Sequence, residues 1–370
     1  MDLFFNILQS VLSFIAIISI IVFIHEFGHY WVAKKCGVMI ESFSIGFGKE
    51  IFGWNDKSGT RWKLSLIPLG GYVKMYGDEN AASVPDKDKI SQMAEDERKK
   101  SFHTQDLWKR FLIVLAGPLA NYIFAIIILS FFFFAYGKPN TSNVISGIQK
   151  ESVAEKFGLQ EGDKIIYLGG SKIKTFEDIR SMVSMHPAIE LDISYERNGE
   201  VKNSKITPEK KVSKDIFGNE VEVGLLGISS SKMEYKKLNF LTSISSAAYE
   251  TYDLSVRTLQ AVGQIITGKR SAEQISGILR IADYSGKSVE QGFKVVFWFM
   301  AVLSVNLGLV NLFPIPMLDG GHLFFYIIEG LRGKPLPEKL QEYFFRFGYG
   351  VLIGLMLLAT FNDLKFFKIF

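Results

Sequence analysis

The sequence predicts a polytopic α-helical membrane protein with four transmembrane helices, a β segment on the cytoplasmic side and one α+β domain outside the membrane. Three observations lead to this class. The mean hydropathy of the 370 residues is positive, at +0.18, and 32 residues are phenylalanine, which together exceed what a soluble core of this size needs. Four apolar runs are long enough, or nearly so, to cross a bilayer. Lysine and arginine gather in two of the stretches between them.

The apolar runs cover residues 3–31, 107–136, 295–313 and 345–361. A spanning helix needs about 20 apolar residues, which the first three runs supply and the fourth reaches only with its flanking phenylalanines. We expect helices within 1–36, 107–137, 294–330 and 345–370. The first run has no basic segment before it and no cleavage site after it, so we interpret it as a retained span rather than a signal peptide.

The first span contains the motif His25-Glu-Phe-Gly-His29. Histidines four residues apart on a helix share a face and can bind one zinc ion, with the adjacent Glu26 as general base. Ionisable residues at membrane depth are costly and usually functional. The alternative is a chance match among the five histidines. The membrane setting favours the zinc interpretation.

The third span ends in Asn311-Leu-Phe-Pro-Ile-Pro-Met-Leu-Asp319-Gly-Gly-His322. Two prolines remove backbone donors and break the helix, which at membrane depth requires a protein-lined or water-filled cavity. Two histidines leave zinc one protein ligand short, and Asp319 would face that cavity as the third. His322 is the competing ligand, which we expect either to contact the metal ligands without binding zinc or to lie at the membrane interface. The alternative is a solvated turn in which Asp319 caps the glycines.

Orientation follows from the basic residues of the short loops. The segment 37–106 and the connection 331–344 are rich in lysine and arginine, so both are expected in the cytoplasm and 138–293 outside. The net charge of +4 reflects these loops, and nothing indicates binding to nucleic acid. The one cysteine, Cys36, excludes an internal disulfide and is interpreted as a passive thiol.

The polar regions have distinct patterns. Residues 40–76 alternate like strands, and their edge could bind an extended peptide or simply close the cytoplasmic mouth of the protein. Residues 77–105 are predicted to form an exposed loop. Residues 138–228 are predicted to form the outer α+β domain. Within 229–293, residues 235–265 indicate an amphipathic helix lying on the outer surface, or a helix that packs against a domain.

Together these motifs resemble the site-2 protease family of intramembrane zinc metalloproteases, and within it the bacterial RseP-like branch (regulator of sigma-E protease type). Further support comes from Gly70-Gly71-Tyr-Val-Lys-Met75 and Ala116-Gly-Pro-Leu-Ala-Asn121. The resemblance covers nearly the whole chain. It implies that His25, His29 and Asp319 bind Zn²⁺ and that Glu26 is catalytic. It also implies that Asn311, Gly70 and Gly71 contact the substrate.

The outer domain resembles a bacterial PDZ domain through Ser152-Val-Ala-Glu-Lys-Phe-Gly-Leu-Gln-Glu-Gly-Asp163 and the strand that follows. Such domains add a peptide to a sheet edge. Some relatives carry two PDZ domains, whereas this chain has one. The family segment Ser-Gly-Pro-Ile-Gly-Ile-Ala appears here as Ser276-Gly-Ile-Leu-Arg-Ile-Ala282, whose role the sequence leaves open.

The expected function is therefore zinc-dependent cleavage of single-pass membrane proteins in a bacterial inner membrane. The resemblance implies substrates such as anti-sigma factors after a first outer cut, or remnant signal peptides. Two other classes remain open. A transporter would also have broken helices and buried charges, but it usually has an inverted repeat. A catalytically inactive PDZ scaffold would have no use for both halves of a zinc site.

Overall fold

The computed structural model describes residues 2–80, 85–214, 220–230, 234–268 and 270–369 of the chain. The chain divides into two compact units. The first comprises Met1–Ser130, Ile244–Leu259 and Ser271–Phe370, and the second comprises Phe131–Ser243 and Gln260–Arg270.

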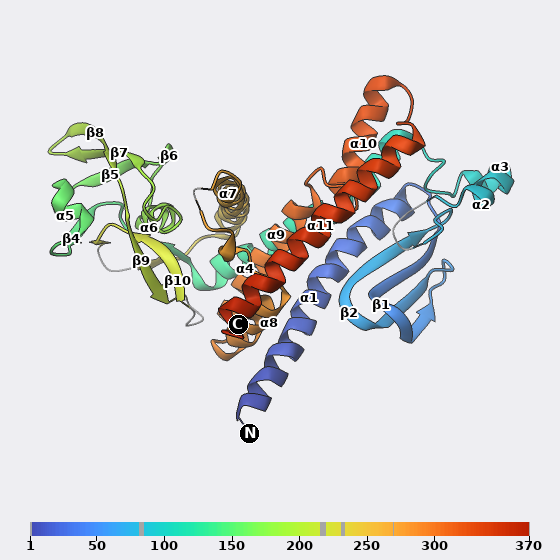
Figure 1. The fold of residues 1–370 in the computed structure, drawn as a ribbon, viewed down its shortest axis with the longest axis horizontal. Coiled ribbons are helices and arrows are strands. Elements are labelled where there is room, and N and C mark those ends of the chain that lie inside the picture. Colours follow the sequence, from blue (N-terminus) through green and yellow to red (C-terminus); the bar gives the residue numbers. More distant parts are fainter. Residues whose placement is uncertain (1, 81–84, 215–219, 231–233, 269, 370) are drawn as a thin grey trace. The chain divides into compact units, whose positions relative to one another are not determined.

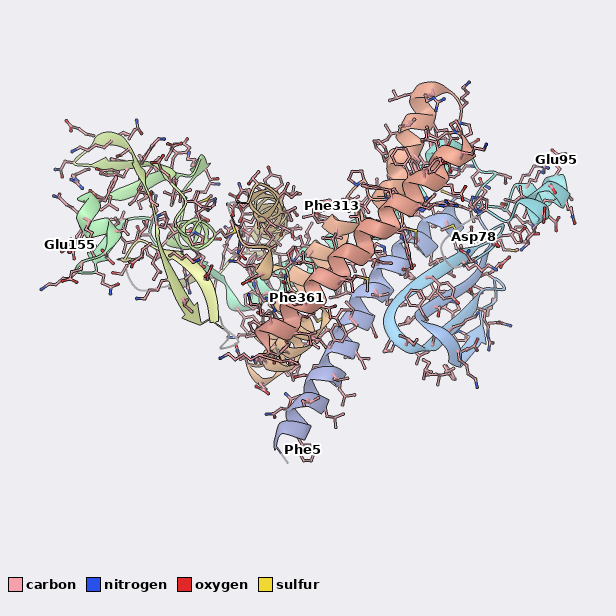
Figure 2. The ribbon with its side chains drawn as sticks, in the orientation of Figure 1. Phe5, Asp78, Glu95, Glu155, Phe313 and Phe361 are labelled. Atoms are coloured by element: carbon pink, nitrogen blue, oxygen red, sulfur yellow. The ribbon has the colours of Figure 1, made fainter. Side chains whose placement is uncertain are left out.

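Four helices of the first unit are long and apolar enough to cross a membrane, as predicted. They are α1 (Asp2–Lys35), α4 (Leu107–Tyr136), α9 (Phe293–Asn311) and α11 (Glu338–Phe366). Figure 1 shows α1 in blue and α11 in red, and Phe5 lies toward the free end of α1 in Figure 2. Helix α11 is longer than the fourth apolar run, because residues that include charged side chains extend the helix at both ends.

A shorter helix, α10 (Asp319–Arg332), follows α9 after the predicted break. α10 is anchored to α4 by an ion pair, in which Arg110 Nη2 lies 2.6 Å from Glu329 Oε1 and Nη1 lies 3.5 Å from Oε2. Both side chains are less than one-fifth exposed. Paired guanidinium and carboxylate groups of this kind restrict orientation as well as distance.

The segment expected to be amphipathic forms helix α7 (Phe240–Ile266), the 3-10 turn η1 (Ala272–Gln274) and helix α8 (Ile278–Glu290). α8 packs against α1. A Cβ on Gly286 would stand 2.8 Å from Ser10 Cα, so the absence of a side chain permits this close approach. The unexplained segment 276–282 therefore begins a helix that covers α1.

Residues 40–76 form an antiparallel pair, β1 (Ile40–Asn55) and β2 (Arg61–Met75), as predicted. The pair is strongly coiled, because Ser44 is registered with both Lys63 and Tyr72. The first half of β1 thus lies between the two halves of β2. One edge of the sheet, in the part of the chain described, is the stretch 71–75.

The predicted loop 77–105 is more ordered than its composition indicated. Residues 81–84 lie outside the described residues, but α2 (Lys87–Gln92) and α3 (Glu95–Arg98) form in the remainder. Asp78, Met93 and Phe102 are buried. Asp78 accepts from the backbone of Met75 and contacts His103 Nε2 at 2.8 Å, so local hydrogen bonds order a segment with few apolar residues.

The second unit contains the predicted α+β domain. A four-stranded antiparallel sheet has the order β6-β5-β7-β8, and three further pairs are β4–β11, β9–β10 and β3–β12. Its strands and helices are β3 (Lys138–Asn140), β4 (Ile145–Ile148), α5 (Val153–Phe157), β5 (Lys164–Leu168), β6 (Ser171–Lys172), α6 (Phe176–Ser184), β7 (Leu191–Arg197), β8 (Glu200–Ile206), β9 (Glu209–Lys214), β10 (Glu220–Leu225), β11 (Ile228–Ser230) and β12 (Glu234–Lys236).

The core of this domain lies between α6 and the sheets, and its largest fully buried side chains include Ile165, Leu168 and Ile179. Ser152 caps α5, whose last residue Phe157 is followed by Gly158 in the left-handed conformation, with φ of 87°. A groove of about 680 Å³ is bordered by α6 and by residues 224–230.

Candidate metal centre

Helix α1 carries three of the predicted site residues within about one turn. His25 and His29 are each 8% exposed, and their Nε2 atoms lie 3.3 Å apart. The four-residue spacing aligns both imidazoles on one face of the helix, as the sequence predicts. Glu26 lies beside them and lines the same cavity.

The break after α9 brings Asp319 to this face. Asp319 is the first residue of α10, and its Oδ2 atom lies 3.1 Å from His25 Nε2 and 3.4 Å from His29 Nε2. Met317 has a φ of 88°, an unfavourable value for a residue with a side chain. Strain of this kind concentrates at functional sites, where the surrounding structure maintains it.

Two glycines allow α10 to begin close to the broken backbone. A Cβ on Gly320 would stand 2.4 Å or less from Leu312 and Phe313, and one on Gly321 would contact Ile315 and Pro316. The glycines after Asp319 are therefore packing requirements of the break. This packing, with Asp319 lining the cavity, favours the zinc interpretation over a solvated turn.

The three side chains fit a zinc ion. The separations between their ligand atoms, 3.1, 3.3 and 3.4 Å, match the edge of a tetrahedron of about 3.3 Å that zinc bonds of 2.0–2.1 Å produce. Asp319 Oδ2 is buried and makes no hydrogen bond. Two imidazole nitrogens and a carboxylate oxygen converging at this distance are the donor set of a catalytic zinc site.

Helix α4 packs against α1 at this site and contacts the His29 imidazole. His29 Nδ1 lies 2.8 Å from the backbone oxygen of Ile113, to which it can donate. A Cβ on Gly117 would collide with the His29 ring, and a Cβ on Gly28 of α1 would stand 2.7 Å from Ala120 Cβ. The motif 116–121, which supports the family resemblance in the sequence, therefore has a structural role that its spacing alone does not reveal.

The zinc-fitting group opens on a cavity of about 540 Å³. The predicted residues Gly70, Gly71, Asn311 and His322 all line it. Other lining residues were not predicted, because an apolar residue carries no chemical signal until the fold places it. They include Phe47, Tyr72, Leu307, Met317 and Leu352.

The second half of β2 forms a wall of the cavity directly against Glu26. A Cβ on Gly71 would stand 3.1 Å from Glu26 Cγ and 2.7 Å from the backbone oxygen of Ser44. Glycine at position 71 thus lets the free strand edge approach the acidic side chain.

Among the residues described, the clustered group of metal-binding side chains is His25, His29 and Asp319. Cys36 is a free, half-buried thiol outside this cluster. His322 lines the cavity, and its ring lies 5.7 Å from that of Phe345.

Two histidines on a helix long enough to span a bilayer, a carboxylate at the start of α10 and a glutamate beside them form a group that fits a catalytic zinc ion. A family model described as "Peptidase family M50" matches residues 13–355. The chain therefore belongs to peptidase family M50, and it is a zinc metalloprotease.

The relatives agree with this membership. A protein of Agrobacterium fabrum that bears the name of a zinc metalloprotease is 41% identical over 359 residues, covering 96% of this chain and 95% of the relative. "Metalloprotease MmpA" of Caulobacter vibrioides is 35% identical over 386 residues, covering 98% of this chain and 97% of the relative.

A solved structure of the PDZ domain of an SdrC-like protein from Listeria monocytogenes is 16% identical. It matches 24% of this chain and 85% of that structure, with a TM-score of 0.19. This score is too low to establish a shared fold.

Proposed function

We propose that this zinc metalloprotease cleaves membrane-spanning segments of single-pass proteins within or near the bilayer. The observation that carries the proposal is the position of the zinc-fitting triad, which lies on α1 and at the break after α9 rather than in a soluble domain. Because the spans are surrounded by lipid, a substrate helix would approach the cavity from within the membrane.

We propose His25, His29 and Asp319 as the zinc ligands and Glu26 as the general base. Bound zinc would polarise the scissile carbonyl and lower the pKa of the attacking water. Glu26 would accept a proton from that water as its oxygen bonds to the carbonyl carbon. Glu26 would then return the proton to the amide nitrogen as the carbon–nitrogen bond breaks.

The edge 71–75 of β2 is the proposed substrate platform. A membrane helix conceals its peptide bonds in its own hydrogen bonds, so it must unwind before attack. An extended segment can replace those hydrogen bonds by pairing with a strand edge. Gly71 would keep this edge close to Glu26, and Gly70 and Asn311, which line the same cavity, would contact the unwound chain.

The proposed setting is a bacterial inner membrane, with the zinc site toward the cytoplasm and the PDZ-like domain (138–228) outside. The basic loops support this orientation. The proposed substrates, anti-sigma factors already cut outside or remnant signal peptides, follow from the family resemblance. A transporter or an inactive scaffold is disfavoured because Glu26 lies beside the triad, where a base for hydrolysis is needed.

The decisive experiment combines metal analysis with cleavage of a model transmembrane substrate. Glu26→Gln should leave zinc content unchanged, because the glutamate is not a ligand, and lower turnover by about 10²–10⁴-fold. Glu95→Gln is the control, since Glu95 is exposed on α3. Substantial cleavage by Glu26→Gln would refute the assignment of the base.

A further inference from the structure

A polar group of α4 faces the second ring nitrogen of His25. Asn121 is fully buried, and its Nδ2 atom lies 3.1 Å from His25 Nδ1. Its Oδ1 atom is buried without a hydrogen-bond partner. Its backbone oxygen accepts from Ser304 Oγ at 2.9 Å, which ties this turn of α4 to α9.

The chemistry of His25 decides which end of the amide must face it. An imidazole that binds zinc through Nε2 carries its proton on Nδ1, so its partner must be an acceptor. A donor in that place would leave the proton on Nε2, where it would exclude the metal. Turning the Asn121 amide by 180° changes no shape and places the orphaned Oδ1 against Nδ1–H.

This rotation of the amide places the Asn121 NH₂ group where Oδ1 had been, so the number of buried polar groups is unchanged. The gain is a hydrogen bond to an imidazole that a cation polarises, which is stronger than one between neutral groups.

The arrangement around His29 provides an independent comparison. Its Nδ1 faces the backbone oxygen of Ile113, which can only accept. Ile113, Gly117 and Asn121 are spaced four residues apart and therefore lie on one face of α4. This row presents a carbonyl for one histidine, space for its ring, and an amide for the other histidine.

We propose that Asn121 is a positioning residue that accepts a hydrogen bond from His25 Nδ1–H and so holds this imidazole in its metal-binding tautomer. The inference rests on the proposed zinc ligands. Outer partners of this kind typically change metal affinity by 10–100-fold when they are removed.

The test measures zinc affinity of the purified, full-length protein by competition with a chromophoric chelator. Asn121→Asp keeps the shape and can only accept, so we expect zinc affinity within a few-fold of the unaltered protein. Asn121→Leu keeps the approximate volume without an acceptor, and we expect a 10–100-fold weaker affinity. Asn306→Leu is the matched control, because Asn306 is also an amide of a membrane helix but accepts from Thr258.

Two outcomes would overturn the proposal. Unchanged affinity in Asn121→Leu would show that no acceptor is needed. Loss of zinc in Asn121→Asp would show that Asn121 acts as a donor, and this variant decides the question even where Asn121→Leu does not fold. His25→Ala distinguishes failure of the zinc-ligand assignment from failure of the role proposed for Asn121. If His25→Ala retains zinc, the ligand assignment fails. If it loses zinc, the result for Asn121 can be interpreted. The visible spectrum of the Co²⁺-loaded variants provides a second readout of ligand geometry.

Discussion

Gly117 has no side chain because the imidazole of His29 occupies the space where one would be. Gly117→Ala should therefore displace the ring and weaken zinc binding by at least the 10–100-fold expected for an outer partner. Gly354→Ala in α11 is the control, since its Cβ would meet open space, and it should be neutral or slightly stabilising. Chelator competition measures both, and equal affinities in the two variants would contradict the argument.

The choice between Asp319 and His322 as third ligand has its own test. Asp319→Ala should lower zinc occupancy and activity together, because it removes the oxygen that completes the triad. His322→Ala should retain zinc, because His322 is not part of the cluster. Metal analysis after dialysis measures both. If only His322→Ala loses zinc, the third ligand is His322 and the assignment of Asp319 is wrong.

Acid should release the sheet from α1 through Asp56. Burial alone would raise the pKa of Asp56, but hydrogen bonds from Ser58, Trp62 and Thr60 outweigh it and hold the pKa well below its ordinary value. Tyr30 of α1 also donates to Asp56. The stabilisation is therefore complete above the unfolded pKa of about 3.9 and is lost progressively as the pH falls from there through the depressed folded pKa.

Trp62 emission measures this transition, because its Nε1–H donates to Asp56. We expect emission to be constant from pH 8 to about 4 and to change only at lower pH, where Asp56 becomes protonated at its depressed pKa. Asp56→Asn should abolish the change, whereas Asp96→Asn on the exposed surface should not. A transition centred near neutral pH would exclude Asp56 as its origin.

At the residue scale, the sequence can predict those site residues that a regular spacing or a reactive side chain makes recognisable. His25, Glu26 and His29 follow from helical periodicity, and Asp319 follows from the proline break. Gly117 and Asn121 act across the interface of two helices, and no local pattern specifies which faces of α1 and α4 meet. Their roles therefore require the fold.

Among the elements, α11 and α8 are joined by a buried polar contact. Asp363 accepts from the backbone of Gly277 at 2.8 Å and of Arg280 at 3.1 Å, and it lies 3.3 Å from Arg280 Nε. Asn362 donates to the backbone oxygens of Ala272 and Ile275. The last turns of α11 thus cap the first turn of α8, which explains the segment that the sequence left open.

Removing this cap should be costly. Asp363→Ala leaves the Arg280 charge and two amide groups buried without their partner, so we expect a loss of about 3–5 kcal/mol in the free energy of unfolding. Glu342→Gln, which breaks an exposed pair with Arg346 in the same helix, should cost less than about 1 kcal/mol. Thermal unfolding in detergent compares the two. Equal stability would mean that the contact contributes little.

Helices and strands with a strong hydrophobic pattern could be predicted from the sequence, and those with a weak pattern could not. The four spans and the β1–β2 pair follow from long apolar runs and alternation. Within 77–105, the short helices α2 and α3 were not predicted, because the local order depends on hydrogen bonds of Asp78 and on the burial of a few side chains. Composition does not report such contacts.

For the whole molecule, the basic loops predict which parts face the cytoplasm. In a Cys36→Ala background, a cysteine at Pro85 should react with a membrane-impermeant reagent only after permeabilisation, and a cysteine at Lys172 should react in intact cells. The physical reason is the excess of lysine and arginine in 37–106 and 331–344. The opposite labelling pattern would reverse the proposed orientation.

The last prediction concerns the PDZ-like domain, which on this orientation cannot reach the zinc site across the bilayer. Its groove of about 680 Å³ suits selection of substrates by their outer segments. Replacing 140–228 with a short flexible linker should preserve cleavage of a substrate already trimmed outside. It should also permit cleavage of an untrimmed substrate that the intact enzyme rejects.

The competing role for this domain is a brace that holds the spans in place. One assay with trimmed and untrimmed substrates separates the two roles, provided that zinc content is measured in the same preparation. If the deletion abolishes cleavage of both substrates and also releases zinc, the domain is a brace. If zinc remains and only discrimination is lost, the domain selects, because the groups proposed for bond cleavage lie on α1, β2 and α10.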